Sequence, residues 1–195
     1  PTTGPDGGGI RQGNLVATIT LLVLFFISLM LVVAAIVVPL RPGLKDVGRV
    51  VTIQGTLYFA LIGAGFMMVE IGLLQRMSVF LGHPIYSLSV LLFSLILTTG
   101  MGSFLSEKLT LDGRASIAIW AIVTGGYLLL LPFVLSELFT AFNHATLSVR
   151  IAICVVIITP AGLLLGFGFP TGMRHIADID SRPTPWFWGI NGAAS

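Results

Sequence analysis

The stretch LVATITLLVLFFISLMLVVAAIVVPL, residues 15–40, runs for 26 residues without a charged side chain. A transmembrane helix needs about 20 mostly apolar residues to cross the hydrocarbon core of a bilayer. The stretch therefore predicts a membrane-spanning helix. Because Ser28 is its only polar group in mid-span, we expect this helix to lie at the periphery of the protein and to face lipid.

Four comparable apolar runs follow, and a further one starts at Trp186. Hydrophobic residues make up 55% of the chain and charged residues 9%, whereas soluble domains carry about 25% charged residues. Helices satisfy their backbone groups within one segment, as the bilayer requires. The sequence predicts an all-α fold, a polytopic transmembrane helical bundle with five full spans plus the start of a sixth, at about residues 15–40, 51–74, 85–106, 115–136, 151–173 and 186–195.

Several function classes are disfavoured by composition and spacing. The net charge of +2 is small and scattered, so no basic face forms for a nucleic-acid partner. The single Cys154 has no partner for an internal disulfide. The three histidines lack metal-ligand spacing, and no catalytic triad or phosphate-binding loop is present. We therefore expect no metal, no cofactor and no catalysis by this chain alone.

The ends of the sequence differ from its apolar body. PTTGPDGGGIRQG, residues 1–13, is rich in Gly and Pro, which is typical of a flexible linker. Residues 14–195 form the predicted transmembrane domain. Because the chain starts at Pro1 and stops within an apolar segment, we expect it to be part of a longer polypeptide.

Basic residues are distributed unequally between the two sides of the predicted bundle. One side carries three of them and the other seven. The positive-inside rule places the richer side, with the loops at 41–50, 107–114 and 174–185, in the cytoplasm. The linker would then lie outside, in the periplasm if the membrane is a bacterial inner membrane. Four aromatic residues are expected as interface anchors: Trp120, Tyr127, Trp186 and Trp188.

The second span carries a polar stripe in which Thr56, Gly63 and Glu70 recur every seven residues. Glu70 lies about 28 Å along the helix from Val51, near the outer interface. An ionisable group at membrane depth is a functional candidate. We therefore predict an intramembrane polar site made of Glu70, Gln75 and Arg76. The alternative is structural, with the Glu70 carboxylate reaching interfacial water or pairing with Gln75, Arg76 or His83.

Small residues mark the helix-packing faces, on the seven-residue stripe of the second span and at four-residue spacing in the third and fifth spans. They are Gly63 in the second span, Thr98 and Gly102 in the third, and Gly162, Gly166, Gly168 and Gly172 in the fifth. Pro160 and Pro170 bracket the last group and remove backbone hydrogen bonds. A tightly packed or broken fifth helix is expected. Broken helices build some transporter sites, although a simple kink is the alternative.

Two long segments carry a family resemblance: FALIGAGFMMVEIGLLQRMSVFLGHPIYSLSVLLFSLILTTGMGSFLSEKL, residues 59–109, and GLLLGFGFPTGMRHIADIDSRPTPWFWGINGAAS, residues 162–195. They resemble the membrane region of bacterial fused major-facilitator-like/spermidine-synthase-like proteins. The resemblance implies a multi-helix membrane region joined to a soluble aminopropyltransferase-like domain. That domain has no counterpart in this sequence, so no polyamine-synthesis residue is carried over, and the linker at 1–13 would be its tether if the domain lies upstream.

Two functions follow as hypotheses. The first is a transporter-like or substrate-handling membrane domain of this fused family, non-catalytic by itself, with Glu70, Gln75 and Arg76 as its site. The second is a structural or accessory subunit that docks with other subunits of a larger bacterial membrane complex, photosynthetic or respiratory. In both, the lipid bilayer is the principal surrounding of the chain.

Overall fold

The computed structural model describes residues 7–44, 47–111 and 113–195, and this part of the chain is almost entirely helical, without a strand. Five helical segments are long and apolar enough to cross a membrane. The predicted all-α membrane bundle with five spans is therefore confirmed. The spanning segments are Gly13–Leu44, Arg49–Leu81, Pro84–Lys108, Arg114–Ala141 and Leu147–Ile179.

The first span is a composite helix that changes its winding near prolines. It consists of α1 (Gly7–Val32), the π-helical η1 (Val33–Val37), α2 (Val38–Leu40) and the 3₁₀-helical η2 (Arg41–Leu44). Pro39 and Pro42 lack the backbone N–H that a regular α-helix needs, so the hydrogen-bond pattern adjusts around them. The helix begins at Gly7, inside the stretch predicted as a linker. Linker residues 1–6 lie outside the described part.

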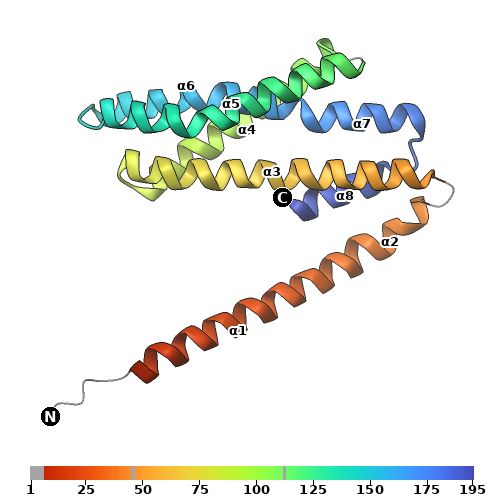
Figure 1. Cartoon of the computed structure of the whole chain (residues 1–195), viewed down its shortest axis with the longest axis horizontal. Helices are drawn as coiled ribbons and strands as arrows, with labels where there is room; N and C mark the ends of the chain where they lie inside the picture. The colour runs from red at the N-terminus through yellow and green to blue at the C-terminus, as the bar shows by residue number, and fades with distance from the viewer. Residues whose placement is uncertain (1–6, 45–46, 112) are drawn as a thin grey trace.

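The first span stands apart from the rest of the molecule. It runs away from the bundle in Figure 1 and approaches it at one end only. Residues 13–31 are exposed throughout. Contact is made near η1 and η2, where Gly189 is packed against Ile36 and Leu40. Within this chain, the helix is thus peripheral, as its uninterrupted apolar sequence led us to expect.

A tight turn joins α3 (Arg49–Leu81) to α4 (Pro84–Lys108). Gly82 takes a left-handed conformation with φ of +77°, which glycine adopts without steric cost. The next residue, His83, caps α4, and its Nδ1 accepts a hydrogen bond from the Ile85 N–H at 3.3 Å. Because α3 runs to Leu81, the helix is longer than the predicted 51–74. Glu70 therefore lies about 16 Å before the end of α3 rather than close to it.

The C-terminal half contains α5 (Arg114–Ala141), α6 (Leu147–Gly166), α7 (Gly168–Ile179) and α8 (Thr184–Ala194). The helical hydrogen-bond pattern of the fifth span is interrupted at Phe167, between α6 and α7, whereas the backbone there keeps a right-handed helical conformation. The interruption is thus intermediate between the broken helix and the simple kink that the sequence left open. Pro170 has no N–H to offer the Gly166 carbonyl four residues earlier, so the regular hydrogen-bond ladder cannot continue there. The helix α8 occupies the predicted start of a sixth span.

A turn ahead of α8 is fixed by one ion pair. The Arg182 guanidinium donates to the Asp180 carboxylate at 2.7 Å, and the Arg182 backbone N–H donates to it at 2.9 Å. These hydrogen bonds lower the pKa of Asp180 below its usual value. The turn directs α8 back along α3, where Trp186 Nε1 donates to Thr56 Oγ1 at 2.8 Å. Trp186 therefore joins two helices and is not only an interface anchor.

The tightest interface of the described bundle lies between α4 and α6. A Cβ added at Gly162 would collide with Thr98 Oγ1, and one at Gly102 would collide with the Leu163 carbonyl. The two backbones can approach this closely only because both positions are glycine. At the end of the bundle that carries the Gly82–His83 turn, Arg150 Nη1 donates to the Phe80 carbonyl at 2.7 Å and so binds α6 to the last turn of α3.

Candidate functional site: a cavity at the broken helix

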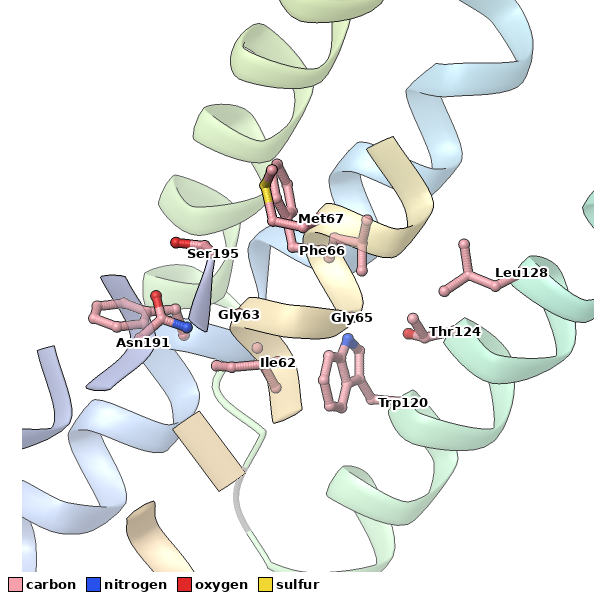
Figure 2. A pocket seen from close by; sticks show the side chains of 13 residues that line it. Ile62, Gly63, Gly65, Phe66, Met67, Trp120, Thr124, Leu128, Asn191 and Ser195 are labelled. Carbon is pink, nitrogen blue, oxygen red and sulfur yellow. The ribbon is translucent and has the colours of Figure 1, made fainter. Parts of the chain in front are cut away.

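The largest described cavity, with a volume of about 650 Å³, lies where α3 and α5 face the break between α6 and α7. Gly65 is the middle residue of α3, and Thr124 lies just before the middle of α5. The cavity is therefore near the mid-length of the spans. Figure 2 shows the side chains around it. The lining residues are Ile62, Gly63, Gly65, Phe66, Met67, Trp120, Thr124, Leu128, Leu165, Gly168, Phe169, Asn191 and Ser195.

The hydroxyl of Thr124 is the polar group of this cavity that needs an explanation. Its side chain is only 8% exposed, and its hydroxyl has no hydrogen-bond partner among the described residues. Figure 2 shows the hydroxyl directed from α5 toward the side of α3 that contains Gly65. A buried hydroxyl without a partner costs free energy, because its hydration is lost and nothing replaces it.

Other hydroxyl residues in the helices avoid this cost by bonding to their own backbone. Thr98 Oγ1 donates to the Ser94 carbonyl at 2.6 Å, and Thr99 Oγ1 donates to the Leu95 carbonyl at 2.6 Å. The same pattern holds in α1, α3, α5 and α6 for Thr18, Thr20, Ser78, Thr140 and Thr159. The Thr124 hydroxyl departs from this pattern, because its oxygen is buried and has no hydrogen-bond partner among the described residues.

Two aromatic side chains hold the broken helix between its neighbours. Trp120 on α5 donates from Nε1 to the Leu164 carbonyl at 2.9 Å, just before the break. Tyr58 on α3 donates from its hydroxyl to the Gly168 carbonyl at 2.7 Å, just after it. The Leu164 carbonyl also accepts from the Phe167 backbone N–H at 3.3 Å, so the side-chain hydrogen bonds add to the backbone bonds on either side of the break. The α6–α7 junction is thereby fixed to both walls of the cavity.

Further cavities continue along the seam between α3 and α5. One of about 240 Å³ begins at Leu128, which it shares with the large cavity, and extends along the seam to Arg76. Another of about 280 Å³ lies in the opposite direction, beyond the Tyr58–Gly168 hydrogen bond, and is lined by residues that include Gln54 and His175. Helices α3 and α5 make only sparse contact with each other. The seam is thus loosely packed over most of its length.

The predicted polar site is spread along the seam and around α3. At the end of the seam nearer the Gly82–His83 turn, Arg76 Nη1 donates to Ser136 Oγ on α5 at 3.2 Å. Gln75 is exposed. Glu70 is half-buried, has no hydrogen bond or ion pair among the described residues, and lines neither of the two neighbouring cavities. The structure therefore does not bring Glu70, Gln75 and Arg76 together, and it does not pair Glu70 with Arg76 or His83.

The glycines predicted for packing fall into two groups. Gly162 and Gly166 meet α4 at Thr98, Thr99 and Gly102. The remaining three meet aromatic or polar side chains at cavities: Gly63 faces Asn191 on α8 and Gly168 faces Trp120 at the large cavity, and Gly172 faces Tyr58 at the cavity of about 280 Å³. Asn191 is held there because its Nδ2 donates to the Phe59 carbonyl at 3.0 Å. The second group shapes the cavity walls.

Sequence reasoning did not single out Thr124, and it interpreted Trp120 and Tyr127 only as interface anchors. In the structure, both aromatic residues are half-buried and donate to backbone carbonyls of α6, Tyr127 to Ile157 at 2.7 Å. A usable signal was present. Trp120, Thr124, Tyr127 and Leu128 recur at three- and four-residue spacing, which places them on one face of α5.

Comparison with known proteins gives no assignment: no family model matches the chain, and no curated protein or solved structure matches it either.

Proposed function

We propose that this chain is a substrate-handling, transporter-like membrane domain whose substrate occupies the cavity between α3, α5 and the α6–α7 break. The carrying observation is the unpartnered, buried Thr124 hydroxyl on the wall of a cavity near mid-span. Substrate sites of many secondary transporters lie near the bilayer midplane and use interrupted helices. The chain acts by binding rather than by catalysis.

The loose seam supports the same proposal. One smaller cavity leads from Leu128 to Arg76, and the other leads from Tyr58 to His175. A substrate moving along this route passes two hydrogen bonds, Arg76 to Ser136 at one end and Tyr58 to Gly168 toward the other. Both bonds join separate helices, so both can open and close with small movements of α5 or α7.

In this proposal, Glu70 is the residue that couples proton binding to substrate binding or flux. It lies on the α3 face that carries Thr56 and Gly63, about 10 Å beyond Gly63 along the helix. Changing Glu70 to Gln is expected to abolish the pH dependence of substrate binding or flux while the protein still folds. An unchanged pH profile would remove Glu70 from the mechanism.

Thiol labelling tests whether the cavity opens during function. In a background where the single Cys154 is replaced by Ala, Thr124→Cys is compared with Thr98→Cys in proteoliposomes. Both threonines are buried, at 8% and 5% exposed, but only Thr124 lines the cavity. We expect N-ethylmaleimide to modify the thiol at position 124 at least about tenfold faster, since thiol reactivity follows access. Equal, slow rates at both positions would refute an accessible cavity.

A second candidate function, a structural or accessory subunit, is favoured by the first span. Residues 13–31 are exposed on all sides and uncharged, so the helix offers a long apolar surface to lipid or to other membrane subunits. This function predicts stoichiometric partners after mild detergent extraction. It also predicts that Glu70→Gln changes little, whereas a bulky residue at Gly162 or Gly166 disrupts assembly.

The family resemblance leads to a further proposal, that a soluble aminopropyltransferase-like domain is fused upstream of this chain. We also propose that the chain lies in a bacterial inner membrane, with the 41–50, 107–114 and 174–185 loops in the cytoplasm. The mass of the native polypeptide tests the fusion, because a value several times 20.7 kDa is expected for the fused protein. Reporter fusions at the 82–83 and 109–113 turns test the orientation, since the two turns must report opposite sides.

A further inference from the structure

We propose that the cavity selects an uncharged, mostly apolar molecule that carries a hydrogen-bond acceptor such as a carbonyl, and that the Thr124 hydroxyl donates to this acceptor. The inference rests on the proposed function and adds to it the chemical class of the substrate and the residue that recognises its polar group.

The size and the lining of the cavity specify an apolar body. A volume of about 650 Å³ falls within the range of pockets that hold one drug-sized molecule. Side chains such as Phe66, Met67, Leu128 and Phe169 supply most of the lining. A molecule with a hydrocarbon chain or ring buries its apolar surface there favourably. Gly65 leaves room for it, since nothing lies within 4 Å of where a Cβ would stand.

The charge pattern disfavours an ionic ligand. None of the described lining residues is Asp, Glu, Lys, Arg or His. A charged group that entered the cavity would lose its hydration without meeting a counter-ion, which is costly. Glu70 lies outside the lining, and the Arg76 guanidinium is at one end of the seam, bonded to Ser136. A polycation such as a polyamine therefore does not fit this cavity.

The hydrogen-bond donors on the cavity wall indicate that the ligand must supply an acceptor. Trp120 has a single N–H, and it already donates to the Leu164 carbonyl. Asn191 donates to the Phe59 carbonyl. The Thr124 proton has no acceptor among the described residues. A ligand that only donates to Thr124 would still leave that proton unpaired, whereas a carbonyl or ether oxygen satisfies it directly.

A matched ligand series tests this assignment. Four probes share a ten-carbon chain and differ in the polar group: methyl decanoate has a neutral acceptor, decane has none, decanoate is an anion, and decyltrimethylammonium is a cation. Binding is measured in nanodiscs by the fluorescence of Trp120 after Trp186→Phe and Trp188→Phe. Native mass spectrometry of the unmodified chain provides an independent count of bound probe.

We expect saturable binding of methyl decanoate and weaker binding of the other three probes. Thr124→Val, which keeps the shape and removes the hydroxyl, should weaken methyl decanoate binding about three- to tenfold, the value of one hydrogen bond. Thr124→Ser keeps the hydroxyl and should bind as the native chain does, which separates recognition from a packing defect.

The contrary outcomes are distinct. Preference for decanoate or decyltrimethylammonium would overturn the neutral-ligand assignment and leave a binding cavity in place. Equal binding of decane and methyl decanoate, or no effect of Thr124→Val, would overturn the role of Thr124. Absence of saturable binding for all four probes, by both measurements, would overturn the inference together with the proposed function.

Discussion

The α4–α6 interface and the α3–α5 seam are built from similar residues but are packed in opposite ways. Thr98 and Gly102 on α4 fit directly against Gly162 and its neighbours on α6, so that no added Cβ is tolerated. Along the seam, Gly65 meets nothing within 4 Å, and Thr124 faces a cavity. A small residue therefore produces close packing only when the facing helix fills the space that it leaves, as Thr98 and Gly102 do at this interface.

The largest effect expected from this contrast is on stability. Gly162→Ala forces a methyl group into Thr98, and overpacking of this kind costs about 1–3 kcal/mol. The matched control is Gly126→Ala on α5, where nothing lies within 4 Å. Alanine there is expected to add up to about 1 kcal/mol through its higher helix propensity. Unfolding in detergent micelles measures both, and a loss of stability at both positions would remove the contrast.

A pair of threonine variants sharpens the comparison. Thr124→Val removes an unpartnered buried hydroxyl and is expected to raise the free energy of unfolding by about 1 kcal/mol. Thr98→Val removes a hydroxyl that bonds to the Ser94 carbonyl, so it is expected to lower that free energy by about 1 kcal/mol. The same unfolding assay serves for both. Destabilisation by Thr124→Val would indicate that the hydroxyl does have a partner within the protein.

The smallest expected effect is at the end of the seam nearer the Gly82–His83 turn. Ser136→Ala removes the acceptor for Arg76, an exposed hydrogen bond of 3.2 Å, and is expected to cost about 0.5 kcal/mol or less. Its more informative readout is labelling of Thr124→Cys from that side of the membrane, which should become faster if this bond limits access. A large loss of stability instead would show that α5 depends on this contact for its position.

Hydropathy and proline positions predict much of the fold. The five spans follow from apolar length, and the break at Phe167 follows from Pro170 and the surrounding glycines. Helix ends were less predictable, because the second span continues to Leu81 through polar residues that the apolar pattern excludes. The turn that finally stops it depends on the left-handed Gly82, a local feature with little hydropathy signal.

The candidate site was largely hidden from sequence reasoning. Glu70 stood out because it is a lone acid in a span, whereas Thr124 resembles the other helical threonines that bond to their own backbone. Only the arrangement of α3, α5 and the broken helix leaves Thr124 without a partner. Likewise, Gly162–Gly166 and Gly168–Gly172 have the same four-residue spacing in the sequence. In the structure, the first pair contacts α4, whereas the second pair contacts aromatic side chains.

The α4–α6 interface also constrains how the protein is made. These two helices are separated in the chain by the whole of α5 and by the loops on both sides of it. Synthesis proceeds from the N-terminus, so the Thr98–Gly102 face of α4 enters the membrane before α6 exists. Helix α5 is inserted in the interval and must leave that face free. The final position of α5 beside the loosely packed seam is thus the place that remains once α6 has docked on α4.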